Sequence, residues 1–96
     1  NGTTASSNTN NSDSGAAYIY KRTGSSWAQE AYIKAANNYS VSDTADHFCR
    51  YASLNSNTLA VGAWWEDSNQ TTITNGTTAS DDDSNSASGA VYVYQR

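Results

Sequence analysis

Most hydrophobic residues of this chain lie in five short runs that are separated by polar stretches. The runs cover residues 16–20, 27–35, 48–54, 58–63 and 90–94. They are rich in aromatic and β-branched residues and are bounded by Gly, Ser, Asn and Thr, which is typical of strands. The pattern predicts an all-β protein built from short antiparallel strands, with no helix.

The first four runs predict two β-hairpins. Residues 16–20 (AAYIY) are apolar almost throughout, as in a strand covered on both faces, whereas residues 27–35 (WAQEAYIKA) alternate as a half-exposed partner strand would. The third and fourth runs form the second hairpin, and the polar residues 55–57 supply its turn. Residues 64–88 predict a long polar loop before the last strand.

The last run repeats the first. The sequence SGAVYVYQR at 88–96 matches SGAAYIYKR at 14–22, and NGTTAS begins at both Asn1 and Asn75, an offset of 74 residues. A self-match at a fixed spacing indicates a repeat architecture, which generally needs about three or more units to close a core. Only about one and a third periods are present. We therefore expect the chain to associate with neighbours.

The order of these elements resembles the FG-GAP repeats of integrin-type β-propellers, especially the bacterial extracellular kind. In that family a Phe-Gly pair opens the first strand and Gly-Ala-Pro ends the second, and their places are held here by Phe48-Cys49 and Gly62-Ala63-Trp64. Residues 89–94 match the third strand of a blade. In the first copy, residues 15–20 and 27–35 match the third and fourth strands.

The resemblance implies antiparallel, four-stranded, blade-like sheets of a β-propeller or of a propeller-like superhelix, in a chain that starts and ends mid-blade. The expected segments are a polar loop or arm (1–14), the third and fourth strands of one blade (15–35), a connection (36–46), the first and second strands of the next blade (47–63), a long polar loop (64–88) and the third strand of that blade (89–96). Unpaired strand edges attract other strands, so we expect copies of the chain, or further repeats, to complete the sheets. A closed ring or an open helical filament would result.

Three positions depart from the family pattern. Cys49 replaces a Gly, so a positive φ there is costly, and Trp64 replaces a Pro that would stiffen the turn. Calcium-binding blades of the integrin type carry an Asp-rich loop between the first two strands. The turn formed by Asn55, Ser56 and Asn57 is too short for that loop and has no carboxylate, so we expect this calcium site to be absent.

Composition narrows the setting of the protein. The formal net charge is −4 with only five Lys and Arg residues, which argues against a nucleic-acid surface, and no run approaches the roughly 20 apolar residues of a membrane-spanning helix. Abundant Asn, Ser and Thr favour an extracellular or cell-surface protein. A single cysteine, Cys49, excludes an internal disulfide. Candidate N-glycosylation sites, which chance alone could also generate, are Asn1, Asn10, Asn38, Asn69 and Asn75.

Two groups of residues are candidates for binding. The acidic residues of the long loop are candidate calcium ligands, since hard cations take clusters of oxygen atoms, namely Glu66, Asp67, Asp81, Asp82 and Asp83. A solvated acidic loop is the alternative, because the first copy has Ser7, Asn8 and Thr9 in place of the three consecutive aspartates. Aromatic residues are candidates for an interface or a ligand site, namely Trp64, Trp65, Tyr92 and Tyr94. No cofactor is required by any of these patterns.

The adjacent tryptophans are expected to pack, one inward and one outward, because neighbouring residues of an extended segment point to opposite sides. His47 lacks a nucleophile or carboxylate at catalytic spacing, and Cys49 lies in an apolar run, so we expect no enzyme. The favoured hypothesis is an extracellular repeat module that self-associates head to tail into a filament or adhesin-like assembly by completing blades between neighbours. The alternative is a closed β-propeller that binds a glycan or protein through its long loops.

Overall fold

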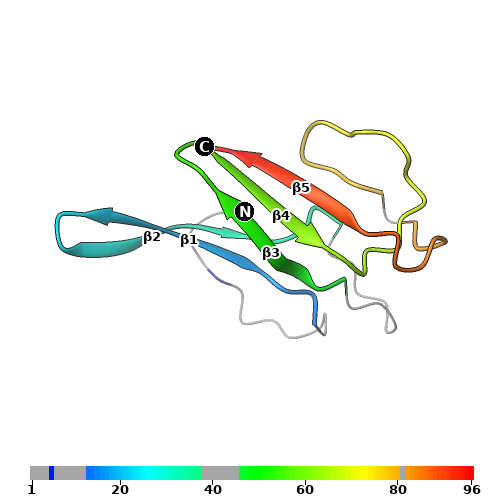
Figure 1. Ribbon diagram of the computed structural model, residues 1–96, viewed down its shortest axis with the longest axis horizontal. Helices are drawn as coiled ribbons and strands as arrows, with labels where there is room; N and C mark the ends of the chain where they lie inside the picture. Colours follow the sequence, from blue (N-terminus) through cyan, green and yellow to red (C-terminus); the bar gives the residue numbers. More distant parts are fainter. Residues whose placement is uncertain (1–4, 6–12, 38–45, 81) are drawn as a thin grey trace.

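The computed structural model describes residues 5, 13–37, 46–80 and 82–96 of the 96-residue chain. Five strands form two antiparallel sheets within these ranges, and no helix occurs there (Figure 1). The prediction of an all-β, antiparallel fold is therefore confirmed. In the same ranges there is no helix long and apolar enough to cross a membrane.

The first sheet is a two-stranded hairpin of β1 (Ala17–Thr23) and β2 (Ser26–Ile33). Gly24 makes the turn between them with a φ of 61°, a left-handed conformation that glycine adopts without a steric penalty. The register shifts once, between Ile19 and Tyr20, where a β-bulge interrupts the pairing. Ala17 pairs with the buried Ile33, so the apolar positions of the two strands share one face.

The second sheet has the order β3-β4-β5, with β3 (Phe48–Leu54), β4 (Thr58–Ala63) and β5 (Ala90–Gln95). β3 and β4 cover the same residues as the predicted strands. The side chain of Asn55 closes the turn between them, because its Oδ1 accepts hydrogen bonds from the backbone N–H groups of Asn57 (3.0 Å) and Thr58 (2.9 Å). This is the turn chemistry that asparagine offers after a strand.

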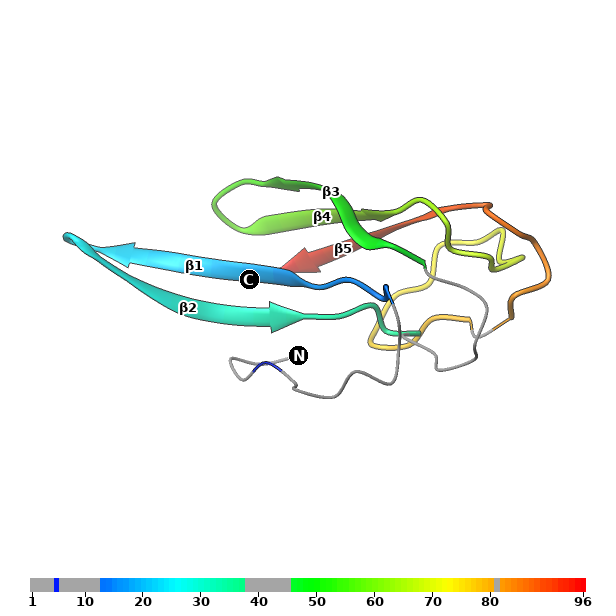
Figure 2. The ribbon, with the colours of Figure 1, turned by 90° about the horizontal axis from the view of Figure 1, so that it is seen from below.

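The two sheets lie one over the other as two layers (Figure 2). Their facing sides form one small hydrophobic core, which comprises Ala17, Ile33, Ala35, Phe48, Leu59, Val61 and Ala63. Tyr92 and Tyr94 of β5 border this core, and their rings meet the ring of Phe48 edge to face at centroid distances of 5.3 and 6.5 Å. The tip of the hairpin extends past the second sheet, which does not cover it (Figure 1).

The start of β3 contains a bulge with an unusual backbone conformation. The register shifts between Phe48 and Tyr51, and Cys49 has a φ of 69°. This is the positive φ that the sequence identified as costly for any residue but glycine, at about 1–2 kcal/mol. A bulge of this kind usually has glycine at the left-handed position. This chain has cysteine at that position.

The two copies of the repeated segment approach their strands with the same backbone conformation. Gly15 and Gly89, which are 74 residues apart, have φ values of 72° and 77°. Two residues before each glycine, Asp13 and Ala87 also share a positive φ, at 54° and 53°. The similarity of the two segments therefore extends from sequence to the turn that precedes β1 and β5.

Candidate functional site

A buried polar cluster holds the long loop at the end of β4. Asn37, Glu66, Asp67 and Ser68 are all buried, and the Glu66 side chain is only 4% exposed. Glu66 Oε1 accepts a hydrogen bond from Asn37 Nδ2 (2.8 Å), and Oε2 accepts one from the backbone N–H of Ser68 (3.1 Å). Burying a carboxylate is costly unless its oxygens are hydrogen-bonded, and these two donors meet that need.

Asn37 links three separate segments of the chain. Besides Glu66, its Nδ2 donates to the carbonyl oxygen of Ser80 in the long loop (2.8 Å), and its Oδ1 accepts from the hydroxyl of Tyr92 on β5 (2.5 Å). Among the described residues, every buried side-chain nitrogen and oxygen has a hydrogen-bond partner. The cluster is thus a satisfied structural network that joins the end of β2, the loop and β5.

Asp67 and Glu66 also guide the chain back into β5. Asp67 Oδ1 accepts from the backbone N–H of Ala87 (2.5 Å), and the Asp67 carbonyl oxygen accepts from the N–H of Asn85 (2.8 Å). The Glu66 carbonyl oxygen accepts from the N–H of Gly89 (2.8 Å). The two acidic residues therefore close the base of the long loop.

The described acidic residues that the sequence singled out for calcium lie in different settings. Glu66 and Asp67 are buried and hydrogen-bonded, whereas Asp82 is exposed and accepts hydrogen bonds from the N–H and hydroxyl of Ser84. Asp81 lies outside the described residues. Across the described ranges, no three His, Cys, Asp or Glu side chains are placed to hold a metal ion. The carboxylates of Glu66, Asp67 and Asp82 thus accept hydrogen bonds that shape the loop.

A concentration of negative charge surrounds Asp46, just before β3. Partial burial raises the pKa of Asp46 to about 6, and the nearby carboxylates of Glu66, Asp83 and Asp67 add to this effect. A like charge nearby disfavours ionisation, as burial does. Glu66, Asp67 and Asp83 of the loop therefore lie close enough to Asp46 to disfavour its ionisation. Sequence analysis did not select Asp46.

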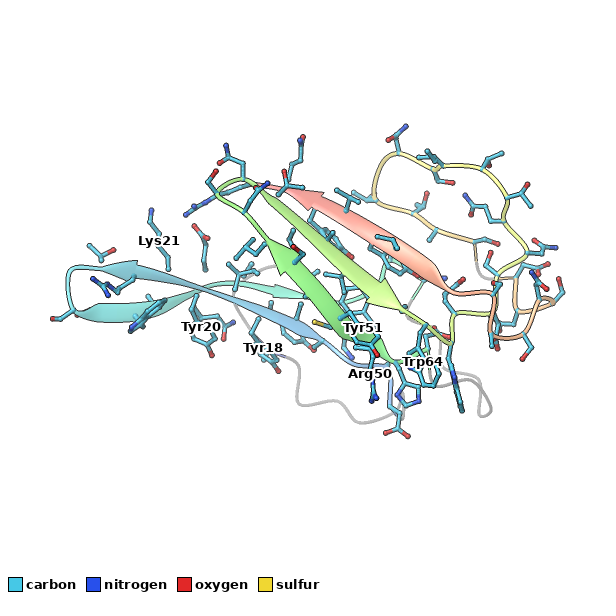
Figure 3. The ribbon with its side chains drawn as sticks, in the orientation of Figure 1. Tyr18, Tyr20, Lys21, Arg50, Tyr51 and Trp64 are labelled. Atoms are coloured by element: carbon cyan, nitrogen blue, oxygen red, sulfur yellow. The ribbon has the colours of Figure 1, made fainter. Side chains whose placement is uncertain are left out.

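Trp64 and Trp65 do not separate into one buried and one exposed residue, and that prediction was wrong. They occupy the turn after β4 instead of an extended strand, and their side chains are 47% and 45% exposed. Their ring centroids are 5.0 Å apart, His47 meets the Trp65 ring edge to face at 5.2 Å, and the Arg50 guanidinium lies 5.8 Å from the Trp64 ring centroid. Figure 3 shows Arg50 and Trp64 at this end of the sheet, beside Tyr51.

The other candidate residues fall into two groups. Tyr92 and Tyr94 are half-buried against the hairpin, where burial raises the pKa of each hydroxyl, and the Tyr94 hydroxyl donates to the Lys34 carbonyl oxygen (3.2 Å). Asn69 and Asn75 are exposed in the long loop, as glycosylation requires. Three further candidate asparagines lie outside the described residues, namely Asn1, Asn10 and Asn38.

A groove of about 970 Å³ lies between β5 and the long loop. Residues 89–94 line one side and residues 70–74 and 76–80 the other. In Figure 1 the loop runs beside β5 on the side away from β4. The second edge of β5 therefore borders an open groove, which an extended chain could enter to pair with it.

The repeated strand buries opposite faces in its two copies. In β1, Ala17 is 5% exposed and Tyr18 is exposed, whereas in β5 the equivalent of Ala17 is Val91, which is 71% exposed, and the equivalent of Tyr18 is the half-buried Tyr92. The next two positions of each copy follow the same pattern, namely Ile19, Tyr20, Val93 and Tyr94. The near-identical sequences AAYIY and AVYVY give no signal of this difference, because it arises from which layer covers each strand.

Comparisons of the chain with protein-family models, with curated proteins and with solved structures found no match. The resemblance to FG-GAP repeats therefore stays a prediction that rests on the residues quoted above.

Proposed function

We propose that this chain is a non-enzymatic, extracellular structural module of the FG-GAP type, which self-associates head to tail by completing blades between neighbours. The observation that carries the proposal is the incomplete pairing of the repeated strand. Within the described ranges, β1 pairs only with β2 along its length, and β5 pairs only with β4. A four-stranded blade would give the same strand both kinds of neighbour.

The free edges favour association. An unpaired strand presents a row of N–H and C=O groups to any extended partner, and natural proteins rarely leave such an edge open. The edge of β5 borders the groove described above, and the exposed side of its sheet carries Val91 and Val93. Exposed strand edges and exposed apolar side chains on one small chain support a role in which neighbouring copies cover them.

A head-to-tail contact joins two different surfaces, so it either closes into a ring or continues as a filament. Blades that continue without closing would form a helical filament or an adhesin-like stalk. Asn69 and Asn75 of the long loop are exposed in the single chain, as the glycan-bearing residues of an extracellular protein are.

Negative-stain electron microscopy of the purified chain, together with sedimentation velocity over a range of concentrations, tests this proposal. Filaments whose length increases with concentration are the expected result. A species that stays monomeric at every concentration would refute self-association. Discrete rings of one mass would instead favour the closed propeller.

A second candidate function, ligand binding by a closed propeller, is favoured by the tryptophan pair. Trp64 and Trp65 offer two half-exposed rings side by side, with Arg50 over one of them. Exposed aromatic faces of this kind stack on sugar rings or anchor protein partners. Tryptophan fluorescence titrations with oligosaccharides would detect a sugar ligand. The Trp65→Ala variant should lose such binding while its assembly stays intact, and an unchanged titration would exclude this role for Trp65.

A further inference from the structure

Each layer of the molecule has an outer face that is rich in apolar or aromatic side chains. On the β3-β4-β5 sheet, Val91 and Val93 are 71% and 64% exposed, and on the hairpin Tyr18 and Tyr20 are about half exposed. We infer that the Val91/Val93 face of one copy packs against the Tyr18/Tyr20 face of a second copy. This inference rests on the proposed function and names the two surfaces that meet.

The contact between the two layers of a single chain provides the template. There, Ala17 of β1 belongs to the hydrophobic core, and Tyr92 of β5 packs against that same core. Val91 is the repeat equivalent of Ala17, and Tyr18 is the repeat equivalent of Tyr92. A Val91 face against a Tyr18 face would therefore bring together, between two copies, the same two repeat positions that share one hydrophobic core within a single chain.

The composition of the sheet's outer face fits this partner. Val91 lies opposite Gly62, which lies opposite Tyr51, and the next row on the same face contains Val93, Ala60 and Ser53. Neither row contains a charged side chain. Small residues such as Gly62 and Ala60 leave room for large side chains from the other surface.

The hairpin's outer face supplies large aromatic side chains. Tyr18 lies opposite Tyr32, with ring centroids 5.2 Å apart, and Tyr20 lies opposite Gln29. Figure 3 shows Tyr18 and Tyr20 leaving β1 on one side while Lys21 leaves it on the other. Aromatic side chains against small and β-branched ones are a favourable combination for packed sheets, because the large rings fill the space above the small residues.

The inferred contact is directional, because its two surfaces differ. Each copy has one valine face and one tyrosine face, carried by different layers, so every bound copy leaves one of each for the next. Pairing of like faces would instead stop at a dimer. This difference makes the inference testable with variants that each block one face.

The experiment compares Val93→Lys, Tyr20→Lys, wild type and an exposed-turn control, Ser86→Lys, by size-exclusion chromatography with light scattering. Wild type and the control are expected to form large assemblies. Each face variant alone should be monomeric, because paired strand edges without a packed hydrophobic face are only marginally stable in water. An equimolar mixture of the two face variants should form a dimer, because one intact valine face then meets one intact tyrosine face. Far-UV circular dichroism checks that each variant folds, and Val91→Lys with Tyr18→Lys forms a second, independent pair.

The outcomes separate this inference from the proposal on which it rests. A monomeric wild type would contradict self-association itself. Large assemblies of wild type and of both face variants would overturn the inferred contact while leaving self-association through strand edges in place. Dimers of Val93→Lys alone, or of Tyr20→Lys alone, would show that like faces pair and would also overturn it.

Discussion

Cys49 has a φ of 69° in the bulge at the start of β3, and in this conformation the Cβ of any residue but glycine crowds the backbone. Replacing it by Gly and, separately, by Ala isolates the effect of that Cβ, because both variants lose the thiol. Relief of the steric cost favours Gly by about 1–2 kcal/mol. The greater freedom of Gly in the unfolded chain offsets about 0.5–1 kcal/mol of this. Cys49→Gly should therefore be more stable than Cys49→Ala by about 0.5–1 kcal/mol.

Urea unfolding followed by circular dichroism, at a concentration where the chain is monomeric, measures the free energy of unfolding of both variants. In a domain of this size the expected difference corresponds to roughly 4 °C in Tm. Gly62 provides a matched control, because it lies in β4 without a left-handed φ, and a Cβ there would make ordinary contacts with Tyr51 at 3.8–3.9 Å. Gly62→Ala should therefore stabilise the chain, so that alanine is favoured over glycine at position 62, the opposite of position 49. A Cys49→Ala variant as stable as Cys49→Gly would refute the left-handed conformation at the bulge.

Three further predictions concern the loop and the repeated turn. The carboxyl of Asp46 has a pKa raised from 3.8 to about 6 in the folded chain, so its contribution to stability is fully present below about pH 4 and is lost as the pH rises through 6. Asp46→Asn should therefore raise the free energy of unfolding at pH 7 by about 1 kcal/mol, a figure reduced for solvent screening. The variant should also gain less stability than wild type when the pH is lowered from 7 to 5. Equal pH profiles of wild type and variant in urea titrations would contradict this. Asn37→Ala should lower the free energy of unfolding by about 2–3 kcal/mol, because it leaves a buried carboxylate oxygen and a partly buried tyrosine hydroxyl without their partner. A loss below about 0.5 kcal/mol in the same assay would show that the network does not hold the loop. Gly15→Ala should destabilise the chain more than Gly89→Ala, although both glycines have a similar positive φ. A Cβ at position 15 would overlap the carbonyl oxygen of Phe48, whereas a Cβ at position 89 would lie 3.6 Å from its nearest neighbour. Thermal melts that rank the two variants the other way would refute this prediction.

The long loop shows how residue type and residue role can differ. The aspartates and Glu66 suggested oxygen ligands for calcium, since carboxylates are the ligands that such cations prefer. In the folded chain Glu66 is bound by Asn37, a residue far away in the sequence that no local pattern singles out. A buried carboxylate needs donors, and only the tertiary structure decides whether a cation or the protein itself provides them.

Strand positions were determined by the sequence alone. Short apolar runs between polar turns predict strands well, because the alternation of side chains along a strand and the turn residues are local properties of the chain. The bounds of β3 and β4, the Asn55 turn and the repeat of the first strand in the last could all be read without a structure. Only the resemblance to FG-GAP repeats, and not the local pattern, indicated Cys49 as a position where glycine is expected.

The tertiary structure decided which face of each strand is buried. Tyr18 and Tyr92 occupy the same position of the repeat, yet one is exposed and the other half-buried, since the second sheet covers β1 on one side and the hairpin covers β5 on the other. It also decided that Trp64 and Trp65 lie together at the surface, because they fall in a turn and not in a strand. Burial depends on contacts between residues distant in the sequence, and a local pattern of apolar residues carries no record of which neighbour will cover them.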